Sequence, residues 1–233
     1  MEHSRSRFNP YLVKSAGLFS IIGGLLSLGG LFYILIVLGS YGLTMNMFSQ
    51  PSSLLPWIYK NSFAYSLLWL HQLLFGVLMV PVPFAGAQLF RQHHSSRSSA
   101  LATLSYLIGM VGFILIILSA LTYFSFSPIT ARGWVQGQSS ALLMHDIFST
   151  LGMQLRLFGM MMISLWLMGI GIHLVRKNKI DMFAWFSFAL LIFTFIVSLG
   201  KAYGAYDWES FLGILLAFTY IWLGLLMRQK SRA

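Results

Sequence analysis

Residues 182–200 read MFAWFSFALLIFTFIVSLG and contain no charged side chain. Arg176, Lys177 and Lys179 precede this stretch, and a single Lys201 follows it. A helix of about 20 predominantly apolar residues is long enough to cross the hydrocarbon core of a bilayer. The stretch therefore predicts a transmembrane helix whose two ends differ in positive charge.

Five further apolar stretches of this kind occur along the chain. The predicted spans are residues 15–40, 67–90, 101–124, 157–175, 182–200 and 211–227. They are apolar on all sides, whereas a lipid-facing strand alternates polar and apolar residues over about ten positions. We predict an all-α polytopic integral membrane protein, in which residues 1–233 form a single domain with a bundle of six transmembrane helices.

The basic residues predict how this bundle is oriented. Eleven of them fall in one set of alternating connections and four in the other. The first set is Arg5, Arg7, Lys14, Arg91, Arg97, Arg176, Lys177, Lys179, Arg228, Lys230 and Arg232; the second is Lys60, Arg132, Arg156 and Lys201. Because cytoplasmic loops are rich in Lys and Arg, we predict that both termini are cytoplasmic and that the connections 41–66 and 125–156 lie outside.

Composition agrees with a membrane location. Hydrophobic residues make up 58% of the chain and charged residues 9%, with a net charge of +10. The basic residues lie beside the predicted spans, where they set orientation, so nucleic acid is not an expected partner. Trp57, Trp69, Trp134 and Trp208 fall near the predicted outer ends, as in an interfacial aromatic belt. We expect a plasma-membrane protein, of the bacterial inner-membrane type, whose main partner is the lipid bilayer.

Two features of the predicted helices bear on packing. Ala16, Ser20, Gly23, Ser27 and Gly30 follow one another at three- and four-residue steps. Such a stripe permits close helix contact, which we expect within the bundle, with a homo-oligomer as the alternative. Pro81 and Pro83 lie in the middle of the second predicted span and predict a kink there.

Every charged residue falls at or beyond the end of a predicted span, which disfavours ion-coupled transport. A candidate ligand-binding rim on the outer face consists of His71, His145, Asp146, Arg156 and Lys201, with Lys60, Arg132, Asp207 and Glu209 around it. We predict a site that opens outward, with the proline kink as its floor. Since its residues lie at solvated helix ends, substituting them is expected to remove ligand binding without loss of protein.

The spacing within this rim predicts part of its structure. His145 and Arg156 are eleven residues apart, so on a straight helix they share nearly the same face and lie about 16 Å apart along its axis. The pair Ser139 and Ser140 is suited to begin such a helix before Ala141.

Neither a phosphate-binding loop nor a paired-carboxylate motif is present, so we assign no catalytic residues and an enzymatic activity is unsupported. The absence of Cys excludes disulfides and thiolate metal sites. His93 and His94 belong to a basic, Ser-rich connection and are interpreted as solvated loop residues.

The run from His71 through Met79, Pro83 and Gly86 resembles the second helix of the catalytic subunits of haem-copper oxidases. That helix also begins on the outer side with a haem-ligating His, so the resemblance implies that His71 is an axial ligand of a b-type haem. It covers one helix in six, the proline spacing differs, and the later His-rich helices of the family are missing. His145 would approach the same haem only if its segment folded back.

Two functional hypotheses follow. The first is a non-enzymatic membrane protein that binds or moves a small or amphipathic molecule, or supports a larger complex through a membrane-protein partner. The alternative is a membrane redox protein that holds a b-type haem through His71, the residue that would then be its metal ligand.

Overall fold

The computed structural model describes residues 10–91, 96–175, 182–202 and 208–231. The described residues are 93% helical, and no strand occurs among them. Six helices are long and apolar enough to cross a membrane: Pro10–Leu38, Ser62–Gln88, Thr103–Val135, Ala141–Ile172, Met182–Lys201 and Glu209–Gln229. The prediction of an all-α, multi-pass membrane protein with six spanning helices is confirmed.

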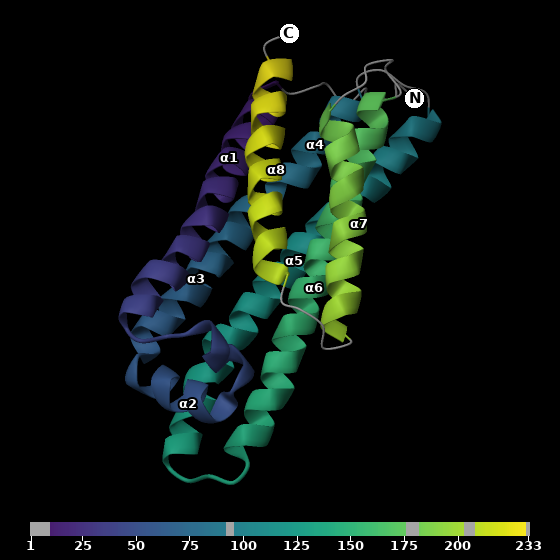
Figure 1. The fold of residues 1–233 in the computed structure, drawn as a ribbon. Coiled ribbons are helices and arrows are strands. Elements are labelled where there is room, and N and C mark those ends of the chain that lie inside the picture. The colour runs from purple at the N-terminus through teal and green to yellow at the C-terminus, as the bar shows by residue number, and fades with distance from the viewer. Residues whose placement is uncertain (1–9, 92–95, 176–181, 203–207, 232–233) are drawn as a thin grey trace, which may run out of the picture.

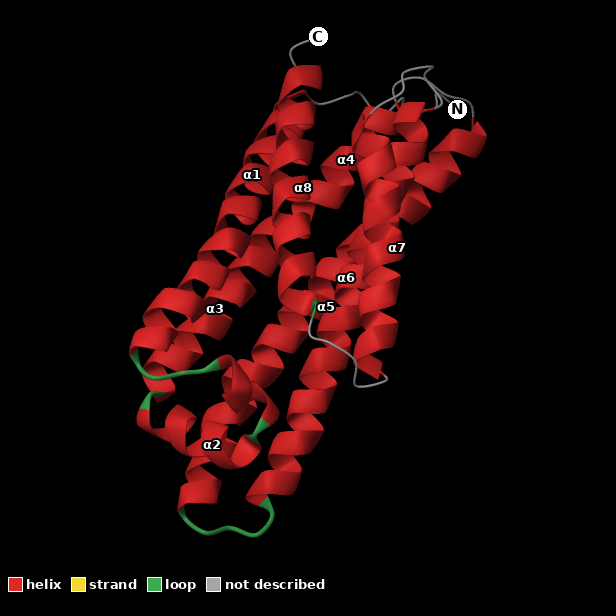
Figure 2. Cartoon of the chain, in the orientation of Figure 1, coloured by secondary structure: helices red, strands yellow, loops and turns green. Residues whose placement is uncertain are grey.

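The helices follow one another as an antiparallel bundle (Figures 1 and 2). In chain order they are α1 (Pro10–Phe32), the π-helical turn η1 (Tyr33–Leu38), the 3₁₀ turn η2 (Met45–Ser49), α2 (Pro51–Lys60), α3 (Ser62–Met79), α4 (Pro81–Arg91), α5 (Ser96–Val135), α6 (Ala141–Val175), α7 (Met182–Ala202) and α8 (Glu209–Lys230). The start of α1 and the end of α8 lie at one end of the bundle, and α2 lies at the other, called here the α2 end.

The described basic residues divide between these two ends as their order in the chain predicted. Lys14 and Arg228 belong to the helix ends near the termini, whereas Lys60 ends α2 and Lys201 falls in the last turn of α7. The two sets therefore lie toward opposite ends of the bundle. That the α2 end faces outward stays a prediction. His93 and His94 lie outside the described residues.

The predicted connection 125–156 is almost entirely helical. α5 continues to Val135, a short turn follows, and α6 already begins at Ala141. The start of α6 is amphipathic, because Leu143 and Ile147 are exposed whereas His145 is only 7% exposed. Because such a helix has polar residues on one face, a search for continuous apolar stretches does not detect it. The helix start predicted after Ser140 is confirmed.

The connection 41–66 also folds into helices, η2 and α2, which cover the α2 end. Trp57 of α2 and Trp69 of α3 are buried, with exposures of 9% and 6%, and the indole N–H of Trp57 donates to the carbonyl of Tyr41 at 2.8 Å. The aromatic-belt interpretation is therefore wrong for these two residues. Trp208, which is 52% exposed, is compatible with it.

The second span is interrupted where its prolines predicted. α3 ends at Met79 and α4 begins at Pro81, with Val80 between them. The amide of Val80 still donates to the carbonyl of Gly76, at 3.1 Å, but Pro81 has no N–H with which to continue the helix.

Glycines allow the closest helix contacts. In α1 and α8, a Cβ on Gly17 would lie 2.9 Å from the carbonyl oxygen of Gly224, and a Cβ on Gly224 would meet that of Gly17. In α5 and α6, a Cβ on Gly112 would lie 2.9 Å from the carbonyl oxygen of Gly159, and a Cβ on Gly159 would lie 2.9 Å from that of Gly112. A Cβ on Gly23 would meet the sulfur of Met79. The small-residue stripe of α1 thus packs within the bundle, as expected.

Candidate functional site

A partly open cavity of about 450 Å³ lies in the α2 half of the bundle. Side chains from α1, α3, α5, α6 and α8 form its walls, and residues 45–54 of η2 and α2 contribute to its outer part. This volume is within the range of small-molecule sites, about 300–1,000 Å³.

One face of α6 forms the longest wall of the cavity. His145, Ser149, Arg156, Met160 and Ile163 line it at steps of three, four or seven residues, so they share one side of the helix. They span about 27 Å along the helix axis. Apart from Met153, polar side chains occupy the part of this wall nearer α2, and apolar ones occupy the part nearer the C-terminal end of α6. The cavity is therefore amphipathic along its length.

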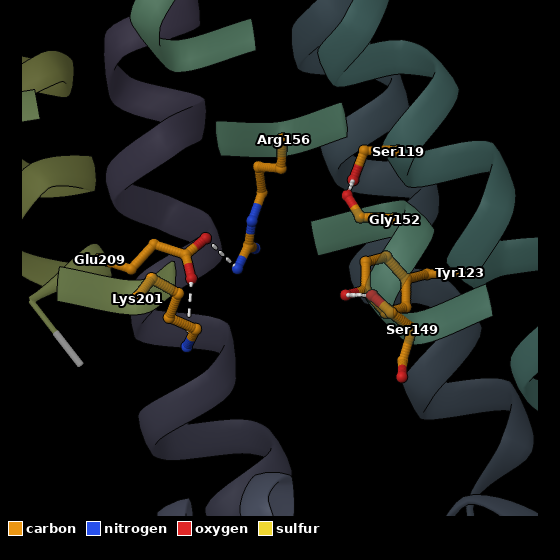
Figure 3. A network of polar contacts seen from close by, with 7 residues as sticks. All are labelled: Ser119, Tyr123, Ser149, Gly152, Arg156, Lys201 and Glu209. Carbon is orange, nitrogen blue, oxygen red and sulfur yellow. Dashed lines mark hydrogen bonds and ion pairs between the residues drawn. The ribbon is translucent and has the colours of Figure 1, made fainter. Parts of the chain in front are cut away.

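An ion-pair network lies at the level where the α6 wall changes from polar to apolar side chains (Figure 3). Arg156 reaches from α6 to form an ion pair with Glu209, the first residue of α8. Nζ of Lys201, at the end of α7, lies 3.8 Å from the other carboxylate oxygen of Glu209. Glu209 is 7% exposed, whereas Arg156 and Lys201 are 28% and 26% exposed. A carboxylate at a helix N-terminus also interacts favourably with the helix dipole.

Hydrogen bonds from α5 hold this part of α6 in place. The hydroxyl of Ser119 donates to the carbonyl of Gly152 at 2.7 Å, and that of Tyr123 donates to the carbonyl of Ser149 at 2.9 Å (Figure 3). The ring of Tyr123 lies against Gly152, where a Cβ would approach it to 2.7 Å. The wall that carries Arg156 is thus fixed to its neighbouring helix.

Aromatic side chains form a second wall on the α3 side. Trp69 stacks on Tyr123, with ring centroids 4.0 Å apart and planes 13° apart, and Tyr65 contacts Trp69 edge-on. All three line the cavity. This wall presents large apolar surfaces that carry polar tips.

Four aromatic rings from four helices close the cavity on the side away from α2. Phe113 of α5 is in ring contact with Phe75 of α3, Trp166 of α6 and Tyr220 of α8, with centroids 6.1, 6.1 and 5.9 Å away. Phe75 and Tyr220 line the cavity, while Phe113 and Trp166 are 0% and 1% exposed. We call these four residues the aromatic floor.

The proline kink does not form the floor, contrary to our prediction. Pro81 and Pro83 are absent from the lining among the described residues. Pro83 instead packs beside Trp166, since a Cβ built on Gly109 would lie 2.9 Å from Cγ of Pro83 and 2.7 Å from Cγ of Trp166. Pro83 therefore supports the floor from outside the cavity, whereas Pro81 is exposed.

Of the five candidate rim residues, four line this cavity: His145, Asp146, Arg156 and Lys201. His71 does not. A Cβ on Gly30 would lie 3.1 Å from Cε1 of His71, which places this ring against α1. Arg156 also differs from its predicted position, since it lies well inside α6 and not at a solvated helix end.

Sequence reasoning named Glu209 only as part of the wider rim and missed the aromatic residues. The available signal was the spacing of Tyr65 and Trp69, which are four residues apart and so share one face of a helix. Lys60 and Arg132, which were also in the wider rim, are exposed and lie outside the lining.

The residues present do not fit a haem held between His71 and His145. α6 continues without a break from Ala141, so the segment of His145 does not fold back, and His71 faces α1 outside the cavity. Among the described residues, no three His, Cys, Asp or Glu side chains cluster as a metal site.

No protein-family model, curated protein or solved structure matches this chain.

Proposed function

We propose that this protein binds a small amphipathic molecule in the cavity, from the α2 end, without transforming it chemically. The observation that carries this proposal is the change of polarity along the α6 wall, from His145 and Ser149 through Arg156 to Met160 and Ile163. A molecule with a polar group and an apolar part matches this gradient, because its apolar part leaves water for a largely apolar pocket.

The aromatic floor favours binding from one side over passage through the bundle. Phe113 and Trp166 are fully packed between the cavity and the half of the bundle nearer the termini. A ligand that entered at the α2 end would meet these rings and stop. With the α2 end outward, in a plasma membrane of the bacterial inner-membrane type, the site takes its ligand from the outer leaflet or from the space above it.

The ionic groups of the rim also favour binding over catalysis. Arg156 and Lys201 are both engaged with Glu209, an arrangement suited to recognising a polar group by charge and hydrogen bonds. We accordingly assign no catalytic residue.

Filling the cavity tests the proposal. Gly213 of α8 lines it, and a Cβ there would meet nothing within 4 Å. We expect Gly213→Phe, in nanodiscs, to weaken saturable binding of a tritiated single-chain phospholipid at least about tenfold while the unfolding temperature is retained. Leu225→Phe, on the exposed side of the same helix, is the matched control and should bind normally. Equal binding by the two variants, or no saturable binding by the wild type, would contradict the proposal.

The same preparation tests the two other hypotheses. A Soret band that disappears in His71→Ala would establish a haem protein; we expect no band, because the His71 ring packs against Gly30. A stoichiometric membrane protein that co-purifies with the chain would support a role as an accessory subunit.

A further inference from the structure

We propose that the polar group of the bound amphiphile is zwitterionic, with its cationic part near Glu209 and its anionic part near Arg156 and Lys201. This inference rests on the proposed function and adds the chemical class of the ligand. It is carried by the signs and the placement of the charges around the cavity.

Charges of both signs line the cavity. Among the described residues, the lining contains two basic side chains, Arg156 and Lys201, and two acidic ones, Asp146 and Glu209. Asp146 is exposed and lies ten residues from Arg156, about 15 Å further along α6 toward the mouth. Glu209 lies deep, between its two basic partners. Positive and negative groups therefore occur together at the boundary between the polar and apolar parts.

Because both signs occur at the level of Glu209, a headgroup with only one sign of charge leaves part of the site without a partner. Arg156 and Lys201 are about three-quarters buried, and Glu209 is more deeply buried still. A charge that enters such a partly enclosed site without compensation is costly. A purely anionic headgroup would compete with Glu209 for the two basic residues, and a purely cationic one would compete with them for Glu209. A zwitterion supplies a partner to each sign and adds no net charge.

The position of the opposite charges on different helices gives the headgroup its orientation. Arg156 belongs to α6 and Glu209 to α8, so the ion pair connects two walls of the cavity. A headgroup inserted between them exchanges one ion pair within the protein for two with the ligand, both strengthened by charge-assisted hydrogen bonds. Ser149 and Ser210 line the cavity and offer further hydroxyls.

The apolar part of the ligand then extends from this level to the aromatic floor. From Arg156 to Ile163 the α6 wall runs about 10 Å. Met160, Ile163 and Leu216 line this depth, and Phe75 and Tyr220 end it. A short section of acyl chain fills such a space, while the remainder of a longer chain would have to leave through the open part of the cavity.

The test compares headgroups on one acyl chain. Lysophosphatidylethanolamine is the zwitterion, lysophosphatidylglycerol the anion, monoacylglycerol the uncharged lipid, and an alkyltrimethylammonium of equal chain length the cation. Binding to the wild-type protein is measured in nanodiscs by competition against the tritiated zwitterion. We expect the zwitterion to bind at least about tenfold more tightly than each of the other three. Glycerophosphoethanolamine, which has the headgroup and no chain, should compete much more weakly.

Variants then test whether the charged residues of the rim cause the preference for the zwitterionic lipid. Glu209→Gln leaves the basic pair without its buried carboxylate, so the anionic lipid should become the tightest of the four. Lys60→Gln also changes the charge of the α2 end by one but lies outside the cavity, and it should keep the wild-type order. If Glu209→Gln fails to fold, the ranking by the wild type still decides the inference.

The outcomes separate the inference from the function on which it rests. If lipids bind but the anionic, cationic or uncharged one equals or exceeds the zwitterion, the zwitterion inference is wrong and the amphiphile site stands. If none of the four binds saturably, the proposed function fails. If the chainless headgroup competes as well as the complete lipid, the ligand is a small polar zwitterion and the amphiphile proposal is overturned.

Discussion

Glu209 is the residue on which the charge of the candidate site depends. It is the carboxylate that both Arg156 and Lys201 contact, and its exposure of 7% is low for an acidic side chain. A buried ion pair is weak evidence for stability, since desolvation offsets much of its Coulomb energy, but removing one partner leaves the other uncompensated. Substitutions in the ion pair of Arg156 and Glu209 are therefore expected to affect both ligand binding and folding. The positions of these residues in the sequence did not show this.

Arg156→Ala is expected to destabilise the protein by about 1–3 kcal/mol, because Glu209 keeps only the longer contact to Lys201. This replaces the expectation that a substitution in the rim leaves protein abundance unchanged. The measurement is thermal unfolding in detergent. Arg132→Ala, an exposed basic residue near the same end, should change stability by about 0.5 kcal/mol or less.

A double variant checks the cause of that loss. Arg156→Ala combined with Glu209→Ala should cost less than the sum of the two single substitutions, because the double variant leaves no uncompensated charge at the pair. Additive losses would show that the two side chains are not energetically coupled.

At the scale of single helices, α8 contains two glycines with opposite surroundings. Gly224 lies against the backbone of Gly17 in α1, while a Cβ on Gly213 would meet nothing within 4 Å. Both are interior positions of one helix. Their sequence contexts are similar, so only the packing of α8 against α1 distinguishes them.

We expect Gly224→Ala to lower the unfolding temperature and Gly213→Ala to leave it unchanged or raise it. The first adds a methyl group where backbone atoms of α1 stand, which forces the two helices apart. The second replaces glycine by a better helix former, worth up to about 1 kcal/mol. Thermal unfolding of both variants in the same detergent is the measurement. Equal effects would mean that α1 and α8 do not pack as described.

In α6, hydropathy predicts only the apolar part of the helix. Its part within the predicted fourth span was recognised, whereas the segment from Ala141 to Arg156 was placed in the connection before that span. This segment alternates exposed apolar residues with the polar residues of the cavity, as Leu143 and His145 illustrate. An amphipathic helix needs a partner on each face, and the sequence does not name those partners.

At the scale of the whole molecule, orientation is the property that most needs measurement. The eleven-to-four asymmetry of basic residues predicts that the α2 end faces outward. The proposed function depends on it, since a cavity open to the cytoplasm would take its ligand from a different compartment.

Cysteine accessibility measures this orientation on a chain that contains no native Cys. Single replacements at Ser52 and Ser139, both exposed at the α2 end, should react with an impermeant thiol reagent in intact cells. Replacements at Ser96 and Ser231, at the opposite end, should react only after permeabilisation. The reverse labelling pattern would mean that the α2 end faces the cytoplasm, and equal labelling of both sets would contradict the six-span arrangement.

The sequence determined three properties of the fold. Six apolar stretches determined the number of spanning helices, Pro81 determined one helix break, and the order of the basic residues determined how charge divides between the two ends. These properties follow from local composition, because a bilayer requires about 20 apolar residues and proline lacks an amide proton. The candidate rim was partly predictable for the same reason: His145, Asp146, Arg156 and Lys201 were expected on one face of the membrane, and all four line one cavity.

Only the tertiary structure decided which of these polar residues meet and what lies beneath them. Arg156 and Glu209 are far apart in the chain, and the ring contacts of Phe113 join four helices. The sequence analysis placed both His71 and Arg156 in the candidate rim. In the structure the His71 ring packs against α1, whereas Arg156 pairs with Glu209 across the cavity. Side-chain contacts between helices depend on the rotation of each helix about its axis, which apolar composition on all sides leaves undetermined.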